Sequence, residues 1–252
     1  MTDRTRTDGR GLADLRPVDI QIQVQRHPEG SVMYTCGGTK VLVSATIEEG
    51  VRDFMRNSGS GWVTGEYAMH PRANADRQRR EGRNGRLSGR TQEIQRLIGR
   101  ALRAALRLDR LGERTITIDC DVLDADGGTR TAAITGGFVA LVMALDGLRK
   151  RGLVGKGVLR EEVAAVSVGL FEGSALLDLC YVEDRDAQVD LNLVATRSGA
   201  IVEVQGTAEG APMTRTEHDA LLEVGLAGVA TLTQKQLAAL DAAGIDLARL
   251  RG

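Results

Sequence analysis

The 252-residue sequence predicts an α+β fold built from two similar halves. In each half, segments that alternate apolar and polar residues come first, and segments with helical periodicity follow them. A glycine-rich hinge, RGLVGKGVL at 151–159, separates the two halves. Because the same order of elements occurs twice, we expect a pseudo-repeat of one α+β unit.

The first half is expected to contain four strands and two helices. Val18, Ile20, Ile22 and Val24 alternate with polar residues, which is typical of a half-buried strand. The expected strands are residues 18–26, 31–37, 40–48 and 114–126, and the expected helices are residues 90–108 and 129–151. The first helix has an apolar stripe on one side and arginines at helical spacing on the other.

After the hinge the pattern starts again. The expected strands are residues 163–171, 175–183, 189–196 and 200–207, and two helices, at about 216–231 and 233–249, are expected to close the chain. These elements predict a second half from 158 to 231, after a first half from 10 to 150, with residues 232–252 as a helical tail.

Composition limits the class of protein. With 42% hydrophobic and 27% charged residues, the chain has the composition of an ordinary globular protein. No stretch reaches the ~20 continuous apolar residues of a membrane helix, and the charged N-terminal MTDRTRTDGRG is unlike a secretory signal. The three cysteines form no CxxC pair, so we expect neither a zinc site nor a disulfide framework. The expected location is the cytoplasm, with no membrane partner.

Positive charge is concentrated in one region. Residues 72–114 contain thirteen arginines against five acidic residues, although the whole chain has a formal net charge of -1. The polar stretch 72–89 lacks apolar periodicity and is expected to be a mobile loop. One interpretation is that this loop binds a nucleic-acid backbone. The other is that it is a solvated loop or a subunit contact, and charge alone does not distinguish the two interpretations.

The stretch LDADGGTRTAAITGG at 123–137 predicts a turn from a strand into a helix, with Thr129 as the cap. A structural turn is one interpretation. The other is an anion site, because free N–H groups at a helix N-terminus and the Arg130 guanidinium both suit a phosphate. Arg90 follows Ser88 and Gly89 at the expected start of another helix, where the same reasoning applies.

The stretch CYVEDRDAQVDLNL at 180–193 contains a candidate carboxylate pair. In a strand–turn–strand arrangement, Asp184 and Asp190 could converge and hold Mg²⁺ or Mn²⁺. The alternative is an acidic hairpin tip in water, although a charge at Asp190 inside an apolar strand pattern needs a reason. The three histidines show no metal-ligand spacing and no nucleophile elbow is present, so the pattern favours chemistry on a phosphodiester.

Long ordered strings in this chain resemble the ribonuclease PH family, the phosphorolytic exoribonucleases that trim tRNA 3′ ends. The strings are DGR, GSGWVTGEYAMHPRA, GRTQEIQRLIGRALR, GERTITIDCDVLDADGGTRTAAITG, AAVSVG, YVED and VEVQGTAEG, and they extend from residue 8 to residue 210. The resemblance implies the ribonuclease PH fold, related to ribosomal protein S5 domain 2, with two βαβ-type halves whose mixed sheets pack against helices. It also implies a homohexamer (a trimer of dimers) and a metal requirement.

The resemblance assigns roles to individual residues. Phosphate binding is implied for Arg90, Gly128, Thr129 and Arg130, and catalysis and metal binding for Asp184 and Asp190. Binding of the tRNA acceptor end is implied for Arg72, Arg77, Arg79 and Arg80. Arg185 and Asp186, which follow Asp184, depart from the small residues that are usual in the family.

The implied activity is that of a tRNA nucleotidyltransferase. Inorganic phosphate, the co-substrate, attacks the last phosphodiester of a tRNA precursor or another structured RNA 3′ end, and a nucleoside diphosphate leaves; the reverse reaction adds nucleotides. One alternative is a non-catalytic RNA-binding ring subunit of an RNA-degrading complex. It predicts a damaged phosphate or metal site, whereas the matched residues are all present. Polynucleotide phosphorylase contains two such cores and further modules, for which 252 residues are too few.

Overall fold

The structure is a computed structural model that describes residue 6 and residues 8–81 and 85–252. Most of the charged N-terminal segment and residues 82–84 of the expected loop therefore lie outside the described residues. The strands are β1 (Val18–Ile22), β2 (Gly30–Cys36), β3 (Thr39–Glu49), β4 (Trp62–Met69), β5 (Arg114–Asp124), β6 (Val163–Phe171), β7 (Ser174–Leu177), β8 (Val189–Thr196) and β9 (Ile201–Ala208). The helices are α1 (Gly89–Ala104), α2 (Thr129–Lys150), α3 (Tyr181–Asp186) and α4 (Arg215–Ala242), with short 3₁₀ turns at Asp53–Met55, Leu108–Arg110 and Leu247–Arg249.

Each half forms its own sheet, which confirms the predicted α+β pseudo-repeat. The first sheet has the order β1-β2-β3-β5-β4 and is mixed, because β4 runs parallel to β5. Since α1 connects these two strands, β4–α1–β5 is a βαβ unit. The second sheet has the order β7-β6-β8-β9 and is antiparallel throughout.

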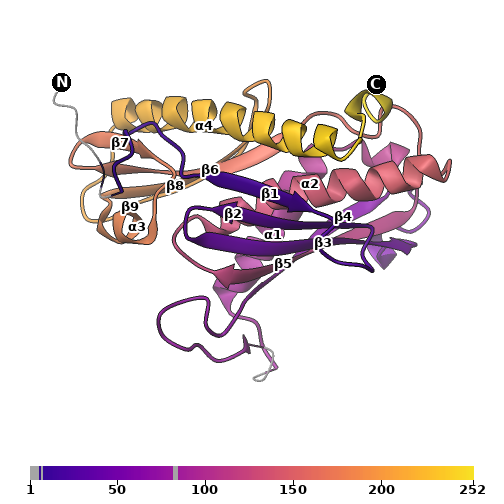
Figure 1. Cartoon of the computed structure of the whole chain (residues 1–252), viewed down its shortest axis with the longest axis horizontal. Helices are drawn as coiled ribbons and strands as arrows, with labels where there is room; N and C mark the ends of the chain where they lie inside the picture. Colours follow the sequence, from indigo (N-terminus) through magenta and orange to yellow (C-terminus); the bar gives the residue numbers. More distant parts are fainter. Residues whose placement is uncertain (1–5, 7, 82–84) are drawn as a thin grey trace.

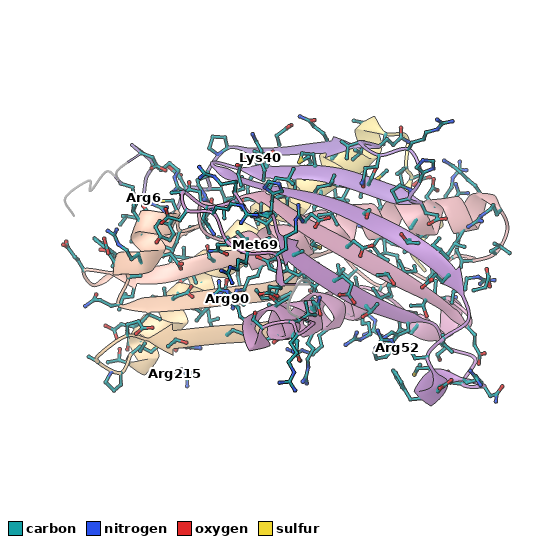
Figure 2. All side chains as sticks on the ribbon, turned by 90° about the horizontal axis from the view of Figure 1, so that it is seen from below. Arg6, Lys40, Arg52, Met69, Arg90 and Arg215 are labelled. Atoms are coloured by element: carbon teal, nitrogen blue, oxygen red, sulfur yellow. The ribbon has the colours of Figure 1, made fainter. Side chains whose placement is uncertain are left out.

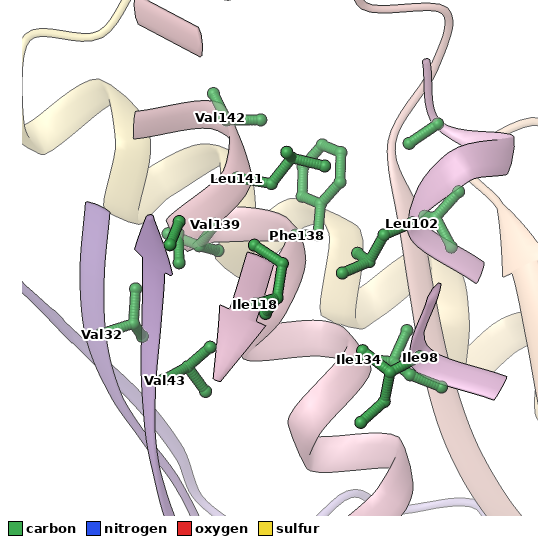
Figure 3. Close-up of a cluster of buried hydrophobic side chains, with 14 of the residues drawn as sticks. Val32, Val43, Ile98, Leu102, Ile118, Ile134, Phe138, Val139, Leu141 and Val142 are labelled. Carbon is green, nitrogen blue, oxygen red and sulfur yellow. The ribbon is translucent and has the colours of Figure 1, made fainter. Parts of the chain in front are cut away.

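Helix α2 lies between the two halves and forms the centre of the core. It contacts β2, β3 and β5 of the first sheet and β6 of the second. Its side chains are apolar on nearly every side, and Figure 3 shows Phe138 among residues from α1, α2 and the first sheet. By length and composition α2 could span a membrane, but 94% of its most apolar window is buried in this protein. Its apolar character therefore belongs to a core helix.

Helix α4 runs along the second sheet on one side of the molecule (Figure 1). The sequence predicted two helices here, and that prediction is wrong: one helix continues from Arg215 to Ala242. The hydroxyls of Thr231 and Thr233 donate to carbonyls of the preceding turn, and the Gln236 side chain donates to main-chain carbonyls of α2 and β6. The hydroxyl bonds do not by themselves stabilise a helix, so the contacts of the buried Gln236 side chain with the core account for its continuation through the two threonines. The tail expected to begin at residue 232 therefore begins inside this helix. The division of the chain into halves at 10–150 and 158–231 stays a prediction.

Other differences also have local causes. Strand β4 was not among the predicted strands, because Gly65 interrupts its apolar pattern. A Cβ at Gly65 would lie 2.7 Å from Ile98 of α1, so the glycine allows helix and strand to approach. Strand β1 ends at Ile22 rather than at residue 26, since Gln23 has a φ of 57° and leaves the extended conformation.

Two glycine substitutions test the packing around α2. A Cβ at Gly30 would lie 2.1 Å from the Ala140 carbonyl oxygen, whereas one at Gly147 would meet no heavy atom within 4 Å. We expect Gly30→Ala to lower the free energy of unfolding by about 1–3 kcal/mol. Gly147→Ala should raise it by about 0.5–1 kcal/mol through helix propensity. Urea unfolding at one protein concentration measures both. Equal effects of the two substitutions would contradict the packing described here.

Candidate active site

A cleft of about 840 Å³ lies where the N-termini of α1 and α2 meet α3 and the start of β8. It is lined by Arg90, Gly128, Thr129, Arg130, Asp184 and Asp190, and also by Arg79 and Arg80 of the arginine-rich loop. Eight of the ten residues singled out in the sequence thus face one cavity, while Arg72 and Arg77 do not line it. Figure 2 shows Arg90 near the middle of the molecule, on the purple start of α1. The volume suits a nucleotide-sized ligand.

Two glycines shape the turn before α2. Gly127 and Gly128 have φ values of 76° and 65°, a region that favours glycine. A Cβ at Gly127 would lie 2.5 Å from the Leu179 carbonyl oxygen, so the turn passes tightly against the chain that leads into α3. The predicted cap is wrong: Gly128 is the N-cap, and Thr129 is the first helical residue. The Thr129 hydroxyl lies 2.8 Å from the Tyr67 hydroxyl instead.

Two helix N-termini and two arginines therefore provide anion-binding groups. The Ser88 side chain accepts from the Thr91 N–H and caps α1, and the Arg90 guanidinium has no hydrogen bond or ion pair with the part of the chain that the structure describes. The Arg130 guanidinium donates to the Gln205 side chain at 3.3 Å. Free N–H groups in the first turn of α2 add a partial positive charge. Together these groups suit a bound phosphate.

The carboxylate pair reaches the cleft from a helix and a strand. The predicted strand 175–183 is wrong beyond Leu177, since β7 ends there and α3 begins at Tyr181. Asp178, with a φ of 54°, ends the strand. Asp184 therefore lies on α3 and Asp190 on β8, rather than on two strands that flank a turn. Both still line the same cleft.

The two carboxylates lie within electrostatic reach of each other and of both arginines. Burial, together with the nearby Asp184 charge, raises the pKa of Asp190 to about 6, while Arg130 and Arg90 oppose that rise. Burial also raises the pKa of Asp184, again against the two arginines. Asp190 is half-buried and Asp184 is open to the cleft. Two neighbouring carboxylates that repel each other favour a proton or a cation between them.

The donor set fits a hard divalent cation. Carboxylate oxygens are the ligands that Mg²⁺ and Mn²⁺ prefer, and such ions commonly complete their shell with water and substrate phosphate. Within the described ranges, no group of three or more His, Cys, Asp or Glu residues could hold a metal ion. Asp184 and Asp190 would thus form a partial site that a phosphate ligand completes.

The described part of the arginine-rich loop, residues 72–81 and 85–88, projects from the body of the molecule (Figure 1). Ala73 anchors its first part: this residue is buried, and its carbonyl accepts from the Ala125 N–H at 2.9 Å. All four loop arginines singled out in the sequence are exposed to solvent. Arg79 and Arg80 line the cleft, and Arg72 and Arg77 do not.

The two residues that depart from the family pattern do not line the cleft. Arg185 and Asp186 are exposed and form an ion pair with each other at 2.7 Å. Their charges therefore largely cancel on the outer side of α3.

Sequence reasoning missed several residues that line the cleft, including Tyr67, Asn192, Asp119 and Asp121. The spacing of Asp119 and Asp121 is a usable signal, because residues two apart on a strand share a face. Burial and the neighbouring acids Asp121 and Glu48 raise the pKa of Asp119. Asn192 lies within an apolar strand pattern and Tyr67 on a strand that was not predicted, and neither context gives an indication of a site.

Family models match both halves of the chain. One describes a 3′ exoribonuclease family, domain 1, and matches residues 14–145. The other describes domain 2 of the same family and matches residues 161–228.

Curated relatives and solved structures agree with this match. Two proteins named Ribonuclease PH are each 54% identical to this chain. The match with the Moorella thermoacetica protein covers 92% of this chain and 94% of that protein. The match with the Exiguobacterium sibiricum protein covers 90% and 91%. The fold is similar to rice (Oryza sativa) Rrp46, with a TM-score of 0.76, 20% identity and coverage of 93% of this chain and 100% of the other. It is also similar to an Archaeoglobus fulgidus exosome chain solved with RNA in the active site, with a TM-score of 0.76, 21% identity and coverage of 92% and 93%.

The raised pKa of Asp190 predicts a stability change in the protein without divalent cations. Because the folded state binds this proton more tightly than the unfolded chain, stability is lost as the pH rises from about 4 to about 6. Asparagine cannot ionise, so Asp190→Asn should increase the free energy of unfolding at pH 8, by at most about 3 kcal/mol, and raise the melting temperature there by several degrees. At pH 4 we expect little change. Thermal unfolding in EDTA between these pH values measures it. Asp186→Asn, at an exposed position, is the control, and an Asp190→Asn melting temperature at or below that of the wild type at pH 8 would refute the prediction.

Proposed function

The chain belongs to the 3′ exoribonuclease family that includes ribonuclease PH, and we propose that it is a phosphate-dependent 3′-to-5′ exoribonuclease. It removes extra nucleotides from the 3′ ends of tRNA precursors and releases nucleoside diphosphates; in reverse it adds nucleotides, as a tRNA nucleotidyltransferase. The observation that carries the proposal is a single cleft with a phosphate-binding helix terminus, two arginines and a carboxylate pair.

Inorganic phosphate is the nucleophile, so the protein needs no activated serine or cysteine. The N–H groups at the start of α2, the Thr129 hydroxyl and the Arg130 and Arg90 guanidinium groups orient it. Fixed donors of this kind also neutralise the charge that develops as the phosphate oxygen attacks the last phosphodiester. Preorganisation is therefore the main contribution of these residues.

Asp184 and Asp190 hold the divalent cation, for which we propose Mg²⁺, with Mn²⁺ as a substitute. The ion supplies charge stabilisation on the phosphoryl oxygens when it is bound. The departing 3′ oxygen requires one proton. The attacking phosphate, as HPO4²⁻, carries a proton that balances this requirement, whereas Asp184 and Asp190 are ionised when they hold the cation.

The arginine-rich loop binds the RNA backbone. Arg79 and Arg80 hold the strand at the cleft, and Arg72 and Arg77 contact phosphates farther along the acceptor end. Guanidinium contacts of this type provide affinity without reading sequence. The assembly we propose is a homohexamer, a trimer of dimers, and light scattering would measure it. Three free, buried cysteines support a reducing cytoplasm as the compartment.

A non-catalytic ring subunit is the second candidate, because one solved structure of similar fold, the Archaeoglobus fulgidus chain, comes from an exosome. At 20–21% identity this similarity concerns the fold alone. The presence of Arg90, Thr129, Arg130, Asp184 and Asp190 in one cleft favours the enzyme.

A tRNA precursor with a few extra 3′ nucleotides tests the proposal. The protein is incubated with this RNA and Mg²⁺, with and without phosphate, and the released nucleotides are separated by charge. We expect nucleoside diphosphates to appear only when phosphate is present. Monophosphates without phosphate would mean that water attacks, and RNA binding without release would favour the ring subunit.

Arg130→Ala should separate catalysis from RNA binding. Since Arg130 acts on phosphate, we expect kcat/KM for phosphate to fall about 10²–10³-fold, as for the loss of one charge-stabilising donor. RNA affinity, measured by fluorescence anisotropy, should change little.

The double variant Arg79→Ala/Arg80→Ala is the matched control. It removes two cations from the loop and should therefore weaken RNA binding. The slope of log K for RNA binding against log salt concentration should become less steep by about 1.4. A parallel loss of RNA affinity and rate in Arg130→Ala would contradict the role assigned to Arg130.

A further inference from the structure

We propose that the N-terminal arm, residue 6 and residues 8–17, contains positioning residues for the reaction. Arg6 and Arg16 of this arm hold α3 and the turn before α2 at a fixed separation. The inference rests on the proposed function, because it concerns the carboxylate pair and the phosphate-binding turn. Its basis is a buried network of ion pairs that joins three segments far apart in the sequence.

Arg6 binds the base of α3. The arm lies at the same end of the molecule as β7 and α3 (Figure 1). The Arg6 side chain is 2% exposed, and its Nε donates to Glu183 Oε1 at 2.7 Å while Nη2 donates to Glu183 Oε2. The same guanidinium donates to the carbonyl oxygens of Leu177 and Asp178. It therefore connects the end of β7 to the helix.

Glu183 connects this contact to the catalytic side of the helix. Its Oε2 also accepts from the Cys180 N–H at 3.0 Å and thereby closes the first turn of α3. Asp184 is the next residue, and adjacent helical residues point about 100° apart. The buried face of α3 thus carries Glu183 while the neighbouring face presents Asp184 to the cleft.

A helix of six residues does not hold its own position. The outer side of α3 is exposed at Val182, Arg185 and Asp186. Its orientation consequently depends on the contacts at its base, of which the bidentate Arg6–Glu183 ion pair is the strongest in charge and geometry.

Arg16 extends the network to the phosphate-binding turn. Its Nε and Nη2 donate to the two carboxylate oxygens of Asp178 at 2.9 and 2.6 Å, and its N–H donates to the same carboxylate at 2.8 Å. Arg16 also donates to the carbonyl oxygens of Asp126 and Gly127. The Asp126 carboxylate in turn accepts from the Tyr181 N–H at 3.1 Å. The turn, the corner at Asp178 and α3 therefore move as one unit.

Mn²⁺ binding to the folded protein tests the role of Arg6. We expect Arg6→Met to raise the Mn²⁺ dissociation constant at least about ten-fold, as removal of a supporting contact does at other metal sites. Arg6→Lys, which keeps the charge but not the two-pronged contact, should give an intermediate value. Free Mn²⁺ is measured by electron paramagnetic resonance, a readout that does not depend on activity.

The matched control is Arg215→Met, which removes an arginine from an exposed ion pair with Asp219 on α4. Its Mn²⁺ affinity and phosphate KM should equal those of the wild type. In Arg16→Lys we expect the KM for phosphate to rise more than the KM for RNA, since the phosphate-binding turn loses its support.

A Mn²⁺ dissociation constant within about twofold of the wild type in folded Arg6→Met would overturn the proposal. Should Arg6→Met fail to fold, Arg6→Lys and Glu183→Gln decide the matter by the same measurement. Unfolding of these variants as well would also overturn it, because the arm would then hold the fold and not the site. A wild-type protein that releases no nucleoside diphosphate refutes the proposed function, which is a separate outcome.

Discussion

The burial of α2 between the two sheets is the constraint on which the rest of the structure depends. A helix that is apolar on nearly every side can be covered only by apolar surfaces from both halves of the chain. Gly136 and Gly137 face Tyr34 of β2 and Leu102 of α1, and their lack of side chains lets those elements approach. Because the whole core fixes this helix, its N-terminus has a fixed place and direction. A phosphate bound there meets donors that do not have to reorganise.

The cleft places opposite charges close together without letting them neutralise each other. Arg90 and Arg130 come from the starts of α1 and α2 in the first half, while Asp184 and Asp190 come from the second half. No direct ion pair joins these arginines to the two carboxylates among the described residues, and burial raises the pKa of both acids in spite of the arginines. An anion and a cation that bind together would satisfy both sets of groups, which is the pairing that phosphate and a divalent metal provide.

The parts of the site that the sequence predicted are those with local signals. Arg90 and the 128–130 turn are recognisable because glycine, hydroxyl and arginine residues stand at helix starts, and a helix start is encoded by a few neighbouring residues. Helix α3 was mistaken for a strand because its place is set by Arg6, more than 170 residues away in sequence. The continuous α4 was divided into two helices because the contacts of Gln236 with α2 and β6 have no trace in the local pattern. The local pattern indicated Asp184 and Asp190 as a candidate carboxylate pair and the family resemblance assigned their roles, but the conformation of the backbone that carries them depends on non-local contacts.

The conformation of Asp178 gives an independent reason to regard the polar network as functional rather than incidental. A φ of 54° costs most L-residues roughly 1–2 kcal/mol; aspartate tolerates it better than most, and glycine adopts it freely. Glycine has no carboxylate, however, and would leave the buried Arg16 guanidinium without its main partner. The Asp178 pKa is held below its usual range: burial alone would raise it, but the hydrogen bonds and charge of Arg16 outweigh that effect. The chain thus keeps an ionised aspartate in an unfavourable backbone conformation at the corner between the phosphate-binding turn and α3, which is where a rigid separation between nucleophile and metal would be required.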